Sequence, residues 1–220
     1  MEHPILRDKA YSTIKQKLLQ RDIRPGERIR EDLLAEEISM SRTPVREAIS
    51  QLTTEGFIVN LPRKGLFCAS IDREEMLDFL KIREALETLA VEECIDRVTD
   101  EEIHHLDLIL INFEQAVISG DRRQASELDS QFHIAIAEIS KSKKLIRFIS
   151  EMSDFMSLAR SKERPDLTVE EKGMSISQHQ EILYAIRQRD IPKAVEAVRV
   201  NIRGMKRKLG LEAAAHISQS

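Results

Sequence analysis

The sequence predicts a mainly α-helical chain of two folded units followed by a short tail. Only 4% of the 220 residues are aromatic, and Trp, which is enriched in strands, is absent. Apolar residues recur at helical spacing over most of the chain after residue 70, whereas the first 70 residues combine shorter helical patterns with a brief β-like stretch. We therefore expect three helices and a small β-hairpin over 1–70, an antiparallel all-α bundle over 71–210, and a tail over 211–220.

Three helices are expected before residue 57. A turn at Pro25-Gly26 separates the first from the second, because proline fixes φ and glycine permits a positive φ. Pro44 marks the first turn of the third helix, where a missing N–H costs nothing, and this makes Thr43 the expected N-cap. Gly56 ends that helix. The three predicted helices cover residues 7–20, 31–38 and 44–55.

A β-hairpin is expected next. Phe57-Ile58-Val59 and Leu66-Phe67-Cys68 are apolar and flank the polar tip Pro62-Arg63-Lys64-Gly65. Two short helices joined by a tight turn form a helix-turn-helix when the second can enter a major groove, and a hairpin beside them forms the wing. The first 70 residues therefore predict a winged helix-turn-helix.

Six longer helices are expected in the bundle, over residues 73–98, 100–119, 122–140, 143–160, 171–188 and 192–209. The expected N-caps are Thr99, Asp121, Ser142 and Asp190, and the expected stops are Gly120 and Gly210. On the first of these helices the apolar residues predict an inward stripe, formed by Phe79, Leu80, Leu86, Leu89 and Ala90.

The net charge of −4 does not by itself favour nucleic acid, but the charge is unevenly distributed. Residues 1–70 contain 12 Lys and Arg against 10 Asp and Glu, and residues 71–220 contain 22 against 28. No apolar run approaches the ~20 residues of a membrane span, and Met1–Ala10 has no signal-peptide core, so we expect a cytoplasmic protein. There Cys68 and Cys94 are expected to be free, packed thiols.

The start of the third helix is a candidate DNA-reading element. Arginine can bind guanine through two hydrogen bonds, hydroxyl groups suit phosphates or bases, and a helix N-terminus favours a phosphate. The residues concerned are Ser41, Arg42, Thr43 and Arg46. Arg63 and Lys64 at the hairpin tip are positioned to contact the minor groove or the backbone. The alternative for each arginine is an ordinary solvated surface group.

A second constellation is expected inside the bundle. Asp129 and His133 stand four residues apart and share a helix face, while His179 and Asn201 lie on the inward stripes of two later helices. Polar groups inside an apolar bundle must satisfy one another or hold something. An imidazole and carboxylate set fits Zn, Ni or Mn, and a hydrogen-bonded network without metal is the alternative.

Arg83 is the remaining candidate, because it falls on an apolar helix stripe where an unpaired charge is costly. A salt bridge to Glu87 or to a neighbouring helix is the alternative.

The N-terminal motifs resemble the winged helix of the GntR family of bacterial regulators. The segments that carry this resemblance are Pro25-Gly26-Glu27-Arg28-Ile29, Leu34-Ala35-Glu36-Glu37-Ile38, Ser41-Arg42-Thr43-Pro44-Val45-Arg46-Glu47-Ala48 and Glu55-Gly56. The resemblance implies a homodimer on a palindromic operator, with Arg42, Thr43 and Arg46 contacting the DNA. The full expected contact set is Arg30, Ser41, Arg42, Thr43, Arg46, Arg63, Lys64 and Gly65. Asp32 departs from the basic residue that FadR-type members often carry at this position.

Residues 73–208 resemble the FCD effector domain of the FadR branch, in its VanR-like form with about six helices. Asp129-x-x-Phe132-His133 and His179-x-x-Ile182-Leu183 match a family metal motif. The resemblance implies that Asp129, His133 and His179 are metal ligands, and Asn201 stands where metal-binding members have a third histidine. It also implies that Arg83 binds the carboxylate of a small organic acid.

These features together predict a ligand-responsive transcriptional regulator, expected to be a repressor, that senses a small organic acid through a bound divalent metal. One alternative keeps the DNA-binding role but has a metal-free site for a bulkier or acyl ligand. A more distant alternative is a metal-dependent enzyme. No separate general base has a convincing placement, and an enzyme would leave the DNA-binding half unexplained, so we expect no catalysis.

Overall fold

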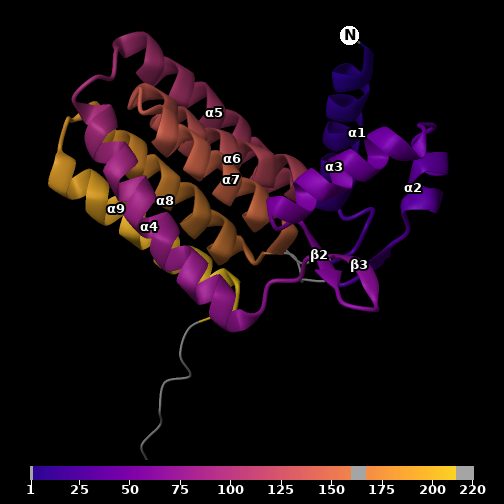
Figure 1. The fold of residues 1–220 in the computed structure, drawn as a ribbon. Coiled ribbons are helices and arrows are strands. Elements are labelled where there is room, and N and C mark those ends of the chain that lie inside the picture. The colour runs from indigo at the N-terminus through magenta and orange to yellow at the C-terminus, as the bar shows by residue number, and fades with distance from the viewer. Residues whose placement is uncertain (1, 160–166, 212–220) are drawn as a thin grey trace, which may run out of the picture. The chain divides into compact units, whose positions relative to one another are not determined.

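The computed structural model describes residues 2–159 and 167–211, which form nine helices and one small sheet (Figure 1). The helices are α1 (Glu2–Leu19), α2 (Glu31–Glu37), α3 (Arg42–Thr54), α4 (Arg73–Ile95), α5 (Asp100–Ser119), α6 (Arg122–Ile139), α7 (Lys143–Ala159), α8 (Val169–Arg187) and α9 (Ile191–Lys208). The strands are β1 (Arg28–Ile29), β2 (Ile58–Leu61) and β3 (Gly65–Cys68). The predicted fold class is confirmed. The predicted tail, apart from Leu211, lies outside the described residues.

Contacts within the chain divide it into two compact units. The first unit is made of Met1–Asp72 and Asp154–Lys162, and the second of Arg73–Ser153 and Glu163–Ser220. Sequence patterns predicted the change near residue 70. They did not predict that the end of α7 belongs to the first unit.

The first unit is a winged helix-turn-helix built around one apolar core. α1 and α3 pack against each other and bury side chains at helical spacing, among them Ile14, Leu18, Val45, Ile49 and Leu52. Beside them is an antiparallel sheet with strand order β1-β3-β2. β1 was not predicted, because a strand of two residues has too little pattern to recognise.

The hairpin of β2 and β3 forms the wing. Its register pairs Ile58 with Cys68 and Leu61 with Gly65. Arg63 and Gly65 have φ values of 64° and 101°, so the chain reverses within three residues and exposes the tip. The predicted hairpin is therefore present, with its turn at residues 62–64.

The predicted N-cap of the third helix is wrong by two residues. α3 begins at Arg42, and Ser41 is the N-cap, with an extended backbone at φ −70° and ψ 158°. Thr43 is instead the second helical residue. A proline is tolerated throughout the first turn, where no N–H has an intrahelical partner, so Pro44 located the helix start only to within a turn.

The last residues of α7 complete the core of the first unit. Leu158 is 2% exposed within that core, and the Phe155 ring stacks on Phe57 with centroids 4.8 Å apart. A Cβ added to Gly56, which has φ +83°, would lie 3.3 Å from the Phe155 ring. Asp154 pairs with Lys15 at 2.7 Å. This segment therefore stabilises the winged helix although it is far away in the sequence.

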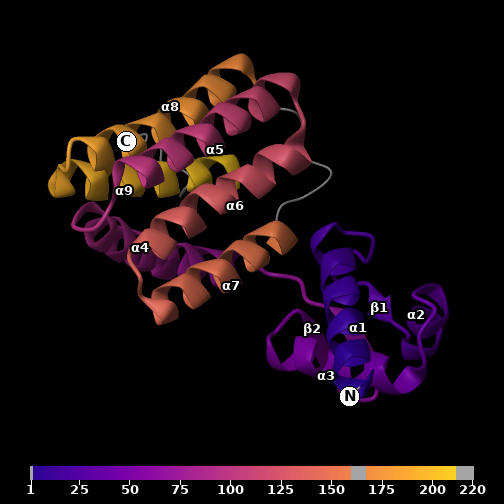
Figure 2. The ribbon, with the colours of Figure 1, turned by 90° about the horizontal axis from the view of Figure 1, so that it is seen from above.

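The second unit is an all-α bundle, seen from above in Figure 2. α8 lies against α9 and α5, α5 against α6, and α4 against α9 and α6. Thr99 forms a capping box with Glu102, and Asp121 and Asp190 accept hydrogen bonds from the helix amides three residues later. These three predicted N-caps are confirmed.

The inward stripe predicted for α4 is partly wrong. Leu80 and Ala90 are buried, but Leu89 is 45% exposed, and Phe79 and Leu86 are only half-buried. The side chains buried with Leu80 and Ala90 include Arg83 and Glu87. Arg83 therefore lies on the buried face of α4, as predicted, and the salt bridge to Glu87 that was considered for it is present inside the bundle.

Both cysteines are free and buried, one in each unit. Burial raises the pKa of the Cys68 thiol to about 11 and that of the Cys94 thiol to about 12. The predicted packed thiols are therefore present, and both stay protonated near neutral pH. Within the described ranges, no helix is both long enough and apolar enough to cross a membrane.

Candidate functional site

Polar side chains from four helices lie inside the second unit. They are Arg83 and Glu87 on α4, Asp129 and His133 on α6, His179 on α8 and Asn201 on α9. None of the six is more than 9% exposed. Such groups are costly to bury unless they pair with one another or hold a ligand.

Local sequence explains why Asp129 and His133 point inward. They lie four residues apart on one face of α6, and Phe132 and Ile136 are buried beside them. The His179 ring comes from α8 and lies 5.6 Å from the Phe132 ring, centroid to centroid. Burial of the apolar neighbours therefore carries all three polar groups into the interior.

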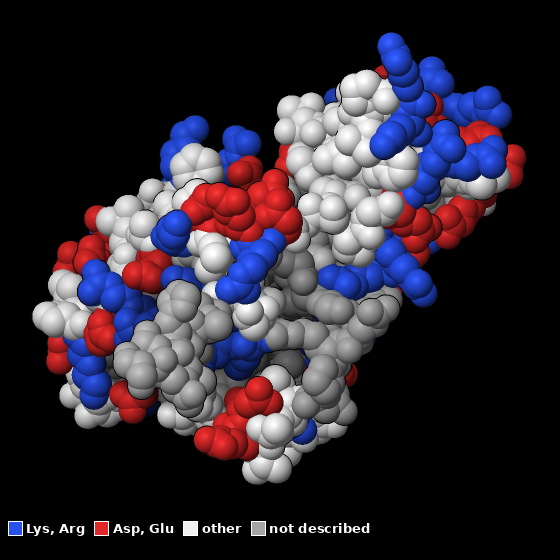
Figure 3. Space-filling model, turned by 90° about the horizontal axis from the view of Figure 1, so that it is seen from below, with Lys and Arg blue, Asp and Glu red and all other residues white. Residues whose placement is uncertain are grey.

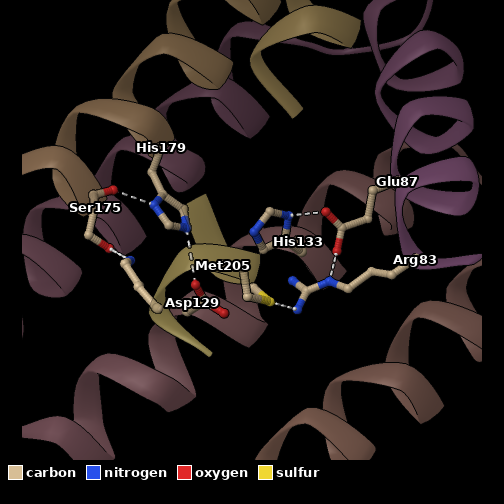
Figure 4. A network of polar contacts seen from close by, with 8 residues as sticks. Arg83, Glu87, Asp129, His133, Ser175, His179 and Met205 are labelled. Carbon is tan, nitrogen blue, oxygen red and sulfur yellow. Dashed lines mark hydrogen bonds and ion pairs between the residues drawn. The ribbon is translucent and has the colours of Figure 1, made fainter. Parts of the chain in front are cut away.

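Asp129, His133 and His179 form a compact donor cluster (Figure 4). Each offers one ligand atom, and these atoms all lie within 4.8 Å of one another. Nδ1 of His179 lies 2.7 Å from the carbonyl oxygen of Ser175. Because a carbonyl can only accept, Nδ1 carries the proton and donates it, which leaves Nε2 as the second ring nitrogen of the cluster.

Nε2 of His179 faces the carboxylate of Asp129. Nε2 of His179 lies 3.2 Å from Oδ1 of Asp129. In the neutral imidazole this contact would set a lone pair against a carboxylate oxygen, so it is favourable only with a cation between them. The cation can be a proton on Nε2 or a metal ion bound by both side chains.

Glu87 connects the donor cluster to Arg83, as Figure 4 shows. Nε of Arg83 donates to Oε1 of Glu87, and Oε2 of Glu87 lies 3.1 Å from Nδ1 of His133. Nη1 of Arg83 contacts the sulfur of Met205 at 3.3 Å. Nη2 of Arg83, Nε2 of His133 and Oε2 of Glu87 are buried with no hydrogen-bond partner among the described residues, the last of these having only its ion-pair contact with His133. Two nitrogens of the site are therefore left to bind something else.

Burial and the neighbouring charges have opposite effects on the pKa values of Glu87 and Arg83. Burial acts to raise the pKa of the Glu87 carboxyl, but Arg83 and His133 outweigh it and lower the pKa to about 2. Burial acts to lower the pKa of Arg83, but Glu87 and Asp129 raise it. Both groups therefore remain charged inside the bundle.

Asn201 is buried on α9, a helix that packs against α4 and α8. It is 3% exposed, and its Oδ1 has no hydrogen-bond partner among the residues that the structure describes. An amide oxygen can ligate a metal or accept a hydrogen bond from a ligand. The clustered donors, which are the two imidazoles and the carboxylate, fit a borderline divalent metal.

The predicted DNA-contacting residues lie at the surface of the first unit. Seven are exposed and Gly65 is half-buried, the full set being Arg30, Ser41, Arg42, Thr43, Arg46, Arg63, Lys64 and Gly65. Figure 3 shows Lys and Arg side chains gathered over one end of this unit, with acidic side chains beside them.

Two of these arginines make surface ion pairs. Nε of Arg46 lies 3.1 Å from Oε2 of Glu31, and Nη2 of Arg30 lies 3.0 Å from Oδ2 of Asp32. The hydrogen bond from Arg30 lowers the pKa of Asp32. Exposed pairs of this kind contribute about 0–1 kcal/mol, so both guanidinium groups can exchange partners at little cost.

Sequence reasoning missed two residues near these sites. Arg28 lies on β1, and its guanidinium is 3.6 Å from where a Cβ of Gly65 would be, so it adds a basic side chain beside the wing. Glu87 was considered only as an ion-pair partner of Arg83, but it also contacts His133. The four-residue spacing of Arg83 and Glu87 gave a signal for the first contact, and none for the second.

Comparison with known proteins assigns both units. The model of the FCD domain matches residues 78–204, and that of the bacterial regulatory proteins of the gntR family matches residues 6–68. The Nta operon transcriptional regulator of Aminobacter aminovorans is 37% identical over 138 residues, covering 62% of this chain and 65% of that protein. The uncharacterized HTH-type transcriptional regulator YdhC of Bacillus subtilis is 30% identical over 151 residues, 68% of this chain and 67% of that protein. The chain belongs to the GntR family.

This GntR-family chain also shares its fold with a solved structure. Escherichia coli McbR/YncC superposes with a TM-score of 0.83, covering 93% of this chain and 97% of that one, at 23% sequence identity. The matching families and relatives are transcriptional regulators rather than enzymes. The predicted family, its FCD domain and the assignment to DNA-binding regulators are therefore confirmed.

Proposed function

We propose that this regulator is a repressor that binds operator DNA as a homodimer and releases it in response to a small organic acid. The acid binds in the second unit between Arg83 and a divalent metal held by Asp129, His133 and His179. The observation that carries this proposal is the pair of buried nitrogens without partners, Nη2 of Arg83 and Nε2 of His133.

The charges of the site support a metal together with an acid. With both imidazoles neutral, Arg83, Glu87 and Asp129 leave one net negative charge in the interior. A divalent ion, Zn, Ni or Mn, would change this to one net positive charge, which a single carboxylate neutralises. Asp129, His133 and His179 would hold the ion, with the amide oxygen of Asn201 as a fourth ligand, and the bound ion would attract the oxygens of the acid.

Arg83 supplies the second contact to the acid. Its Nη2 is not used by the Glu87 pair and needs an acceptor, and the planar guanidinium suits a carboxylate. The acid can change DNA binding only if it binds one arrangement of the protein more tightly than another. We propose that this preference alters the spacing of the two winged helices of the dimer, which must match half-sites about one helical turn apart.

Asn201 favours a second candidate function. It stands where metal-binding members have a third histidine, and an amide oxygen is a weaker ligand for zinc than an imidazole. The same regulator could therefore bind a bulkier or acyl ligand without metal. Arg83 and the unpaired oxygen of Asn201 would then contact the ligand directly.

At the DNA, we propose that the exposed start of α3 enters the major groove. Arg42, Thr43 and Arg46 contact bases and phosphates there, while Ser41 and Arg30 contact the backbone. Arg63, Lys64 and Gly65 place the wing against the minor groove. Exposure of all these positions except the half-buried Gly65 supports the assignment.

Replacing Arg46 by alanine should weaken operator binding by about 1–3 kcal/mol, because a charged contact to a base or phosphate is lost. The measurement is a fluorescence anisotropy titration with a duplex from upstream of the protein's own gene, at several salt concentrations. Arg97→Ala is the matched control, since Arg97 pairs with Glu93 on the surface of α4. The DNA assignment is wrong if the unsubstituted protein shows no salt-dependent affinity or if both variants behave alike.

Purified protein should bind one divalent ion per chain, and Asp129→Ala should weaken that binding about 100-fold or more, since loss of an outer partner alone costs about 10–100-fold. Isothermal titration with Zn²⁺, Ni²⁺ and Mn²⁺ separately measures this. Asp107→Ala is the control, because Asp107 is an exposed carboxylate paired with Arg187. An organic-acid response without any metal binding would replace the leading proposal by the metal-free one.

A further inference from the structure

Glu87 contacts both Arg83, which we propose binds the acid, and His133, which we propose binds the metal. It is 3% exposed, and its carboxylate has one oxygen on Nε of Arg83 and the other 3.1 Å from Nδ1 of His133. Glu87 and His133 are far apart in the sequence and lie on different helices, so no sequence pattern indicates their contact.

Oε2 of Glu87 makes an ion-pair contact with Nδ1 of His133 and has no other partner among the described residues, so it places an unshared carboxylate oxygen beside that ring nitrogen. A carboxylate only accepts hydrogen bonds, so a stable contact requires Nδ1 to be the donor. The neutral ring then has a bare Nε2, and this is the nitrogen that is buried without a partner. His179 is held in the same way, by the carbonyl oxygen of Ser175 on its Nδ1. Both imidazoles therefore present Nε2 to the cluster with Asp129.

We propose that Glu87 is a positioning residue, which fixes His133 in the tautomer that binds metal and at the same time orients Arg83 for the acid. The inference rests on the proposed function insofar as the cluster is taken as a metal site. Histidine ligands commonly donate their second N–H to a carboxylate or carbonyl, which fixes the ring and increases its basicity. Here the single carboxylate of Glu87 contacts both His133, the proposed metal ligand, and Arg83, the proposed acid-binding residue.

The substitution Glu87→Gln separates this role from simple ion pairing. Arginine is donor-only, so the oxygen of the introduced amide has to face Arg83, and the NH₂ group of that amide then faces His133. Two donors cannot share that contact. The His133 ring must accept at Nδ1 and move its proton to Nε2, which removes the lone pair that a metal needs.

The direct test is the tautomer of His133 in metal-free protein. Two-dimensional ¹H–¹⁵N NMR of ¹⁵N-histidine-labelled protein, recorded well above the ordinary imidazole pKa of about 6.5, distinguishes the two neutral tautomers. The unsubstituted protein should show a protonated Nδ1, and Glu87→Gln a protonated Nε2. Glu84→Gln is the matched control, because Glu84 lies one turn away and pairs with Arg199 outside the site.

A second experiment uses isothermal titration to measure the affinity of each protein for Zn²⁺ and for Ni²⁺, with no organic acid present. Glu87→Gln should weaken binding about 10–100-fold, and Glu84→Gln should leave it unchanged. A protonated Nε2 in the unsubstituted protein overturns the inference, even if Glu87→Gln does not fold. An unchanged metal affinity in Glu87→Gln also overturns it. No metal binding in the unsubstituted protein, with the expected tautomer, overturns the metal part of the proposed function instead.

Discussion

Replacing Arg83 by methionine should reduce the free energy of unfolding of the second unit by about 3–5 kcal/mol, because it leaves the Glu87 carboxylate buried without its arginine. The pKa of Glu87 agrees in direction, since Arg83 and His133 lower it below the ordinary value although burial acts to raise it. The same variant should lose any response of DNA binding to organic acids. Urea unfolding followed by circular dichroism measures the first effect, and operator titration with an acid panel measures the second.

The double variant Arg83→Met/Glu87→Met should regain part of the lost stability without regaining the acid response, because the unpaired charge is gone but Nδ1 of His133 loses its carboxylate. An apolar pair of similar volume often replaces a buried ion pair at little cost, whereas a single unpaired charge cannot be accommodated. Arg199→Met is the matched control, because Arg199 is half exposed and lies 3.8 Å from Glu84, and its effect should stay within about 0.5 kcal/mol. Equal destabilisation by Arg83→Met and Arg199→Met would contradict the buried-pair argument.

Leu158→Ala should destabilise the first unit by about 2–5 kcal/mol, although the residue lies far outside the winged-helix sequence. Leu158 is 2% exposed in the core that contains Ile14, Leu18 and Leu52, so the substitution leaves a cavity there. Operator binding should fall at temperatures where this unit begins to unfold. Thermal unfolding in the presence and absence of the operator duplex measures both effects.

Leu33→Ala is the control for this prediction, because Leu33 belongs to the same unit and is 51% exposed. It should change stability by no more than about 0.5 kcal/mol. If the two leucine variants unfold alike, the end of α7 is not part of the winged-helix core. A fragment that stops at residue 72 should show the same loss of stability as Leu158→Ala, or a larger one, since it lacks the whole segment.

Much of the fold was predictable because its signals are local. A cap such as Thr99 with Glu102 needs only three residues of sequence to be recognised, and Asp129 and His133 share a helix face by spacing alone. The helix-turn-helix was likewise encoded by a turn, a proline and short apolar repeats. Predictions that needed the exact start of a helix were less secure, and Thr43 as an N-cap was wrong for that reason.

The other errors had a different cause. β1 exists only because Arg28 and Ile29 pair with Phe67 and Leu66, and no local sequence pattern indicates that pairing. On α4 the predicted inward stripe was wrong at Leu89, which is exposed. Arg83 is buried, as its place on that stripe predicted, and the salt bridge to Glu87 that the sequence offered as the alternative is present.

The type of each unit, most of the helices and the residue types available for a site follow from local sequence. The contact of Glu87 with both Arg83 and His133, and the place of Leu158 in the winged-helix core, depend on how distant segments pack. Periodicity and capping chemistry act over a few residues and show which face of a helix is buried. They carry no information about which distant segment covers that face, because packing in three dimensions makes that choice.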